Sequence, residues 1–237
     1  MSRQGIRIGS LALINPVIAG SGEHVMTPSG IRAALAAGAA GVVAKSVNES
    51  PVAADQLDIA DYALVRPDNT VGVWGEGHDH SLFCRSGLAQ RPLDDWFAEI
   101  AMLDREAGCG GQFVAASIIP ARLDAAVGLA RQAGAASIRV LELNVGSPQA
   151  LEAAPGTILL EGDAARLGRL VGDVRAAFGG QLWVKLPGLG TNLADLARAA
   201  RAAGADAVVL CGRFMAMVPD VETLAPVMGS AGGYSGG

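Results

Sequence analysis

The fold is decided by one stretch, Leu141–Gln149, whose sequence is LELNVGSPQ. An apolar run that begins at Ile138 leads into this stretch, which ends in a cluster of polar residues. The pattern predicts a buried strand that delivers Asn144 and Ser147 to its C-terminal end. In an α/β barrel, ligands bind at that end of the strands. The rest of the chain is therefore interpreted as scaffold for this strand end, or as a partner to it.

The same local pattern occurs three times along the chain. An Ala-rich helical stretch reaches a glycine, at Gly38, Gly134 and Gly204, and a short apolar run rich in β-branched residues follows. Glycine suits the left-handed backbone position that ends a helix. The apolar run suits a strand of a parallel sheet that is buried on both faces. Repeated helix–glycine–strand units predict βα alternation around a parallel sheet.

Six strands and five helices are predicted from these patterns. The strands span Asn15–Ala19, Gly41–Lys45, Gln112–Ile118, Ser137–Leu143, Gln181–Leu186 and Ala207–Leu210. The helices span about Pro28–Ala37, Leu93–Ala107, Arg122–Gln132, Asp163–Phe178 and Leu193–Ala203. Two short apolar runs around Gly9 and Ser10 predict a hairpin that covers the bottom of a barrel. The long segment Asn48–Gln90 does not fit the βα unit and is typical of a functional loop or lid.

The composition is that of a globular protein with a sizeable core. Of the 237 residues, 51% are hydrophobic, 4% aromatic and 17% charged, and the formal net charge is −5. A mildly acidic chain offers no basic surface for nucleic acid and little attraction to anionic membranes, so neither partner is expected. Three widely spaced cysteines without a CxxC pair favour a reducing compartment. With no signal peptide and no apolar run of about 18 residues, a soluble cytoplasmic protein is expected.

Polar residues follow several of the predicted strands. Gly20-Ser21-Gly22 follows the first strand, either as a turn that lets a ligand approach the backbone closely or as an ordinary tight turn. Lys45 and Ser46 end the second strand, and Lys185 ends the fifth. Lysine is rarely buried unless it is paired or functional. The two lysines therefore predict an anionic or electron-rich ligand at the barrel mouth.

Simpler interpretations remain open after the fourth strand. Asn144 suits a turn that bonds its own backbone, and Ser147 suits a helix N-cap or turn hydroxyl. No histidine near Ser147 in the sequence is placed to activate it, which disfavours a Ser-His-Asp hydrolase. His78 and His80 form a His-x-His pair, but no second His or Cys cluster has ligand spacing, so no metal site is predicted.

Five short motifs lie at strand ends or in the loops that follow them. In chain order they are Asn15–Gly22, Ala44–Val47, Leu143–Pro148, Val184–Leu186 and Gly232–Gly236. Together they resemble the dihydroorotate dehydrogenase family, the flavin-dependent (β/α)8-barrel enzymes, over nearly the whole chain. The resemblance implies an α/β fold of the TIM-barrel type in which residues 1–237 form one FMN-binding domain with about six of the eight βα units. We expect either that the sequence is a C-terminally incomplete fragment, or that a partner chain or a homo-oligomer supplies the other strands.

The resemblance also implies a role for each matching residue. Ser147 and Lys45 are the candidate catalytic residues, because Ser147 stands where the family has the base that removes a substrate proton during hydride transfer to the flavin. The residues expected to bind FMN are Gly20, Ser21, Gly22, Lys45, Ser46, Asn144, Lys185, Ser235 and Gly236. The residues expected to face the substrate are Lys45, Cys84, Gln90, Asn144, Gln149 and Cys211.

The chain departs from the family at the substrate side. Gln149 stands where the family has an asparagine after the proline, Cys84 and Gln90 replace two asparagines that hold orotate, and Cys211 replaces a third. A site built of amides loses discrimination when the amides change. We therefore expect an FMN-dependent oxidoreductase that acts on a CH–CH group of a small molecule other than dihydroorotate.

Three other functions stay open. One is a dihydropyrimidine dehydrogenase-like subunit, which shares the fold. Another is a lyase or aldolase barrel that uses Lys45 or Lys185 as a Schiff-base amine. The last is a non-catalytic paralogue that has lost its substrate amides. The sequence has no cysteine cluster for an Fe–S centre, so it identifies no electron acceptor.

Overall fold

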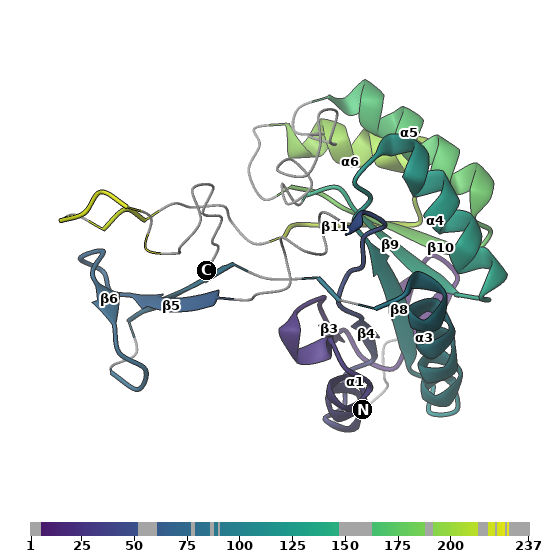
Figure 1. Cartoon of the computed structure of the whole chain (residues 1–237). Coiled ribbons are helices and arrows are strands. Elements are labelled where there is room, and N and C mark those ends of the chain that lie inside the picture. Colours follow the sequence, from purple (N-terminus) through teal and green to yellow (C-terminus); the bar gives the residue numbers. More distant parts are fainter. Residues whose placement is uncertain are drawn as a thin grey trace.

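The computed structural model describes residues 6–51, 61–76, 79–85, 88–89, 91–146, 163–187, 192–212, 218–220, 222–225 and 227. Its main body is a curled parallel sheet of six strands, in the order β11-β10-β9-β8-β4-β3 (Figure 1). The strands are β3 (Ile18–Ala19), β4 (Gly41–Val43), β8 (Phe113–Ile118), β9 (Val140–Asn144), β10 (Gln181–Lys185) and β11 (Ala207–Val209). The six predicted strands and their order are confirmed, and the α/β architecture is that of a partial TIM barrel.

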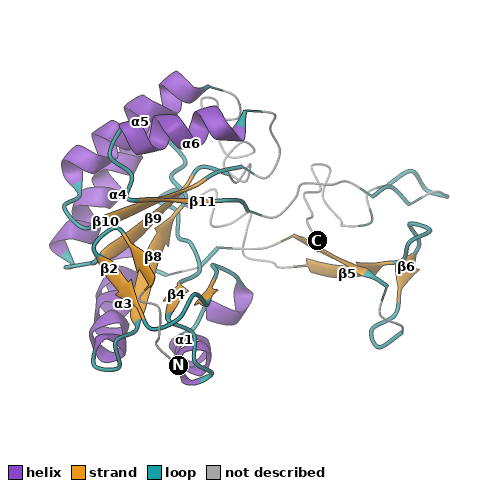
Figure 2. Cartoon of the chain, turned by 180° about the vertical axis from the view of Figure 1, so that it is seen from behind, coloured by secondary structure: helices purple, strands orange, loops and turns teal. Residues whose placement is uncertain are grey.

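Helices follow the strands and cover one side of the sheet. They are α1 (Pro28–Ala36), α3 (Leu93–Gly108), α4 (Leu123–Ala135), α5 (Ala164–Ala177) and α6 (Leu193–Ala202). Figure 2 shows them on the outer side of the strands, as in a βα-repeat protein. Their starts follow local chemistry, since the hydroxyl of Thr27 accepts a hydrogen bond from Gly30 N and the carboxylate of Asp163 accepts one from Arg166 N. The five predicted helices are confirmed. No helix in the described part of the chain is long and apolar enough to cross a membrane.

The prediction that a left-handed glycine ends the helix is confirmed at two of the three repeats. Gly38 and Gly204 have φ of 101° and 102°, in the left-handed region that glycine adopts without strain. The prediction for Gly134 is wrong, because α4 runs through it to Ala135. Ser137, three residues later, takes the left-handed conformation with φ of 63°. The helix continues to Ala135, and the turn that leads to β9 forms at Ser137.

Two apolar layers hold the sheet. The larger lies between the strands and the helices. The smaller lies inside the curl, where the rings of Phe113 and Trp183 meet edge to face with centroids 5.5 Å apart. The N-terminal hairpin, β1 (Ile6–Ile8) and β2 (Leu11–Leu13), packs against this inner layer, and Gln181 Nε2 donates to Ser10 Oγ over 2.8 Å. The hairpin thus covers the N-terminal ends of the strands, as predicted, and leaves their C-terminal ends uncovered by it.

One buried carboxylate links α3 to the sheet. Asp104 accepts hydrogen bonds from Val114 N at the start of β8 (2.9 Å) and from Arg139 Nη2 just before β9 (2.7 Å). These side-chain hydrogen bonds raise the pKa of the Arg139 guanidinium above its usual value. Asp104 therefore links α3 to the N-terminal ends of both central strands, β8 and β9.

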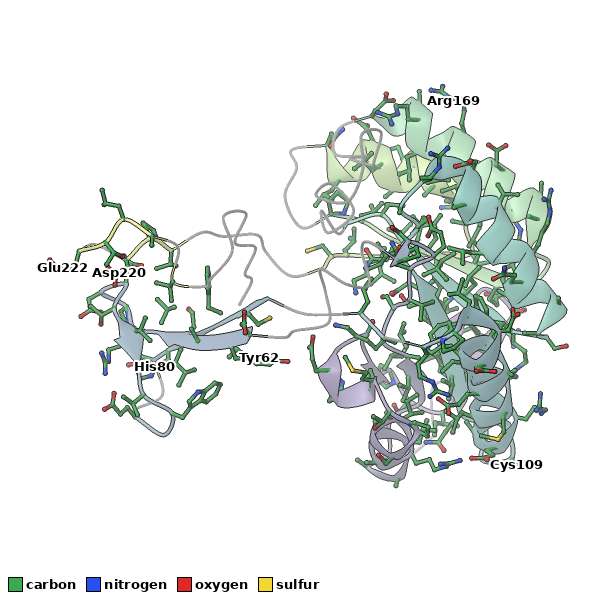
Figure 3. All side chains as sticks on the ribbon, in the orientation of Figure 1. Tyr62, His80, Cys109, Arg169, Asp220 and Glu222 are labelled. Atoms are coloured by element: carbon green, nitrogen blue, oxygen red, sulfur yellow. The ribbon has the colours of Figure 1, made fainter. Side chains whose placement is uncertain are left out.

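The segment between β4 and α3 contains a second sheet, which we call the arm. It consists of β5 (Asp61–Val65), β6 (Val71–Gly72) and β7 (Ser81–Arg85), all antiparallel, in the order β6-β5-β7. Figure 1 shows the arm apart from the barrel body, and Figure 3 places Tyr62 and His80 on it. The sequence predicted a loop or lid here, and the antiparallel strands are what it missed. The arm's own core is small, made by Val65 and Phe83 with Val218 packed against them.

Candidate functional site

Polar side chains that follow β3 and β4, or lie on β8, β9 and β10, join in one chain of contacts near the C-terminal ends of the strands. Ser21 Oγ lies 3.2 Å from Ser46 Oγ, which lies 2.8 Å from Ser117 Oγ. Ser117 Oγ donates to Glu142 Oε1 over 2.8 Å, and Lys185 Nζ lies 3.9 Å from the same oxygen. We call these five residues the strand-end network. It crosses five neighbouring positions of the sheet at the end where α/β barrels bind ligands.

The strand pattern places the two innermost members. Ser117 pairs with Glu142 in the parallel register of β8 and β9. Both follow inward-facing apolar residues by the two-residue period of a strand, Ala115 on β8 and Val140 on β9, which belong to the inner layer. Ser117 is fully buried and Glu142 is 1% exposed. A buried carboxylate is costly unless it is hydrogen-bonded or paired, and the network supplies both.

Lys45 has a separate carboxylate partner. Its Nζ donates over 2.8 Å to Glu23 Oε1, in the short 3₁₀ helix Glu23–Val25 that follows β3. The Lys45 side chain is 4% exposed, whereas that of Glu23 is 28% exposed. Lys45 and Lys185 are the only lysines in the sequence, in which every other basic side chain apart from the histidines is an arginine. A ligand at the mouth therefore meets two lysine–glutamate pairs.

The loops after β9 and β10 are held against each other. Val145 N donates to Lys185 O over 3.0 Å, and a Cβ on Gly146 would lie 2.6 Å from Leu186 O. Asn144 Oδ1 accepts a hydrogen bond from Gly146 N over 3.0 Å. The structure thus shows Asn144 in the turn-forming role that the sequence left open. The close backbone approach explains why glycine stands at Gly146.

Small residues border the lysines on both sides. Gly20 is exposed, and a Cβ added there would meet no atom within 4 Å. Past β11, a Cβ on Gly212 would lie 3.7 Å from Lys185 Cε, which puts the Cys211–Gly212 segment next to that lysine. The edges of the site therefore expose backbone, which a flat ligand can approach more closely than it can approach side chains.

Several predicted site residues lie elsewhere or outside the described residues. Cys84 is buried on β7, opposite Tyr62, so the structure places it in the arm and not among the strand ends. The predicted residues outside the described part of the chain are Ser147, Gln149, Gln90, Ser235 and Gly236. Their roles, like the binding roles assigned to the described residues, stay predictions.

Three members of the site were missed from the sequence: Glu23, Ser117 and Glu142. For two of them a signal existed, since Ser117 and Glu142 are polar residues inside otherwise apolar strand runs. The two-residue period places each of them on the inward face. Glu23 carries no such signal, because its contact with Lys45 depends on how the chain turns after β3. In the described ranges, no three His, Cys, Asp or Glu side chains gather as a metal site would require.

Comparisons with known proteins add a relationship over the whole chain. The catalytic subunit of dihydroorotate dehydrogenase B (NAD(+)) from Carboxydothermus hydrogenoformans is 28% identical over 233 residues, which cover 98% of this chain and 69% of that protein. The subunit of the same name from Methanocella arvoryzae is 29% identical over 230 residues, covering 96% and 68%. That from Porphyromonas gingivalis is 34% identical over 101 residues, covering 42% and 32%.

No protein-family model matches the chain. Among solved structures, 2,3-dimethylmalate lyase, a member of the PEP mutase/isocitrate lyase superfamily, aligns with a TM-score of 0.45 and 16% identity, covering 81% of this chain and 57% of that one. The sequence similarity to the first two of these subunits covers 98% and 96% of this chain. Over nearly its whole length the chain is similar to the dihydroorotate dehydrogenase B catalytic subunits.

Proposed function

We propose that the protein is an FMN-dependent oxidoreductase that oxidises a CH–CH group of a small-molecule substrate at the C-terminal mouth of its sheet. The observation that carries the proposal is the placement of the only two lysines. Lys45 follows β4 and Lys185 ends β10 in the same sheet, and each lies beside a carboxylate. Every other cationic side chain apart from the histidines is an arginine, so the compact ammonium groups of the chain occur only at these two strand ends.

The residues present fit a flavin. The open space beside Gly20 and the backbone near Gly212 would admit the flat ring, with Ser21 and Ser46 as hydroxyl partners. Lys185 would lie at an edge of the ring, where its ammonium would stabilise negative charge that develops on reduction. When bound, FMN would supply the hydride acceptor.

The chain's own residues would orient the substrate and manage its proton. The ion pair with Glu23 fixes the Lys45 ammonium, which would hold the substrate over the ring. Ser147, outside the described residues, is proposed as the base that takes the substrate proton. We propose a substrate other than dihydroorotate, because Gln90, Gln149 and Cys211 stand where the family has amides that bind the substrate.

The relatives' names support a partner as well. They are called catalytic subunits and their names include NAD(+), so we propose that electrons leave this chain toward a second subunit. A Schiff-base mechanism gains no support from the site. An ion pair stabilises the charged ammonium, whereas a Schiff base forms from the neutral amine.

The test is a titration of FMN into the purified protein, followed by flavin fluorescence and the visible absorption bands. We expect saturable binding that weakens about tenfold or more in Lys185→Gln, since a charge-assisted hydrogen bond contributes about 1.5–3 kcal/mol. Arg198→Gln, which removes a mostly exposed arginine on α6, is the matched control and should bind like the parent. Absence of flavin binding, or equal binding by both variants, contradicts the proposal.

A further inference from the structure

We propose that Ser21, Ser46 and Ser117 form a proton relay from the barrel mouth to Glu142, and that Glu142 takes up a proton when negative charge develops at the mouth. The inference rests on the proposed function, because it takes a reduced flavin to be the source of that charge. It assigns Glu142, the one buried carboxylate of the strand-end network, a role beyond holding Lys185 in place.

The direction of every hydroxyl in the relay follows from one hydrogen bond. Ser117 Oγ donates to Glu142 Oε1, which uses the single proton of that hydroxyl. Ser46 must then donate to Ser117 over 2.8 Å, and Ser21 must donate to Ser46 over 3.2 Å. All three protons point inward to the carboxylate. At the outer end, the lone pairs of Ser21 Oγ are left to accept a proton.

A proton arriving at Ser21 can move this pattern by one step. Ser21 Oγ gains the new proton and passes its own to Ser46, Ser46 passes its own to Ser117, and Ser117 passes its own to Glu142 Oε1. Each O–H bond that breaks is replaced by one that forms. The net change is one proton lost from solvent at the mouth and one carboxylate converted to a neutral acid. The electrons that reduce the flavin come from the CH–CH substrate, or from the chemical reductant of a titration, and do not pass through the serine relay.

The ends of the relay differ in the way this transfer requires. Ser21 is half-buried after β3, next to exposed Gly20, whereas Ser117 and Glu142 are buried. The charged groups that face the relay are Lys185 on β10, beside Glu142, and the Lys45–Glu23 pair after β4 and β3. Negative charge added at the mouth attracts the Lys185 ammonium and so weakens the interaction of that ammonium with Glu142. The weaker interaction favours the neutral acid form of Glu142. Once Glu142 is neutral, the Lys185 ammonium can interact with the negative charge of the reduced flavin alone.

The experiment measures the midpoint potential of the FMN-loaded protein against pH. For a two-electron couple, a tenfold change in proton concentration shifts the potential by about 30 mV for each proton taken up. If Glu142 binds one proton on reduction, the slope is steeper by about 30 mV per pH unit across the range in which it does so. Glu142→Gln, which keeps the size and cannot take the proton, should lose this increment. The control is Glu106→Gln on α3, which changes an exposed ion pair with Arg32 and should keep the steeper slope.

Ser117→Ala gives an independent test, because it breaks the relay with a small change and keeps Glu142. Its expected signature is slow uptake, seen as a delayed rise of the infrared band of protonated carboxylic acid after the flavin is reduced. That band should be present in the parent and absent in Glu142→Gln. FMN binding without a Glu142-dependent band or slope overturns the relay and leaves the oxidoreductase proposal standing. Absence of FMN binding overturns both.

Discussion

Replacing Asp104 with alanine is expected to destabilise the fold more than replacing an exposed carboxylate on the same helix. The carboxylate is 2% exposed and accepts from Val114 N, a fully buried amide. An unsatisfied buried donor costs about 1–3 kcal/mol. The lost contact with Arg139, whose side chain is half exposed, adds about 0–1 kcal/mol because solvent screens it. Together the two contributions are about 1–4 kcal/mol.

Urea unfolding followed by far-UV circular dichroism measures this change in the free energy of unfolding. The melting temperature should fall by roughly 2–16 °C, at about 2–4 °C per kcal/mol for a chain of this size. The control is Glu106→Ala on the same helix, which removes an ion pair with Arg32 in which both side chains are about half exposed. It should change stability by no more than about 0.5 kcal/mol. Equal losses in the two variants would refute the reasoning from burial.

Three further substitutions test the geometry. Gly146→Ala should lower stability by about 1–3 kcal/mol and weaken FMN binding, because its Cβ would strike Leu186 O at 2.6 Å; unchanged unfolding and binding curves would contradict the close approach. Gly128 lies on the exposed face of α4, and a Cβ added there would meet no atom within 4 Å. Gly128→Ala should therefore raise the free energy of unfolding by about 0.5–1 kcal/mol in the same assay, because glycine loses more backbone freedom on folding than alanine does. Asp163→Ala removes the cap on Arg166 N and should cost about 1 kcal/mol, with Asp163→Asn close to the parent.

The sequence predicts the barrel body well because its signals are local. An apolar run of five or six residues between helices is sufficient to place β8 or β9, and the left-handed glycines mark where helices end at Gly38 and Gly204. Gly134 shows the limit of this reasoning, since a glycine inside a helix and one at its end look alike in sequence. The arm was missed for a similar reason. Its short strands alternate weakly and carry turn residues that also suit a long loop.

The site is predictable where a residue's place on a strand decides its direction. Lys45 and Lys185 were found because a charged residue that ends an apolar run is conspicuous. Glu142 was missed because its place in the site depends on a hydrogen bond from Ser117, which is 25 residues away in the sequence. The Lys45–Glu23 contact depends on the path of a 3₁₀ turn, which residue patterns do not fix.

The distribution of tryptophan gives the molecule a built-in pair of optical reporters. Trp96 and Trp183 are 2% and 3% exposed, on α3 and inside the curl of the sheet, whereas Trp74 in the arm is 65% exposed. A soluble quencher reaches Trp74 and spares the other two, so quenchable emission reports on the arm alone. The unquenched emission belongs to the barrel body, where Trp183 on β10 lies two residues from Lys185. The two parts of the chain can therefore be followed separately in one unlabelled sample.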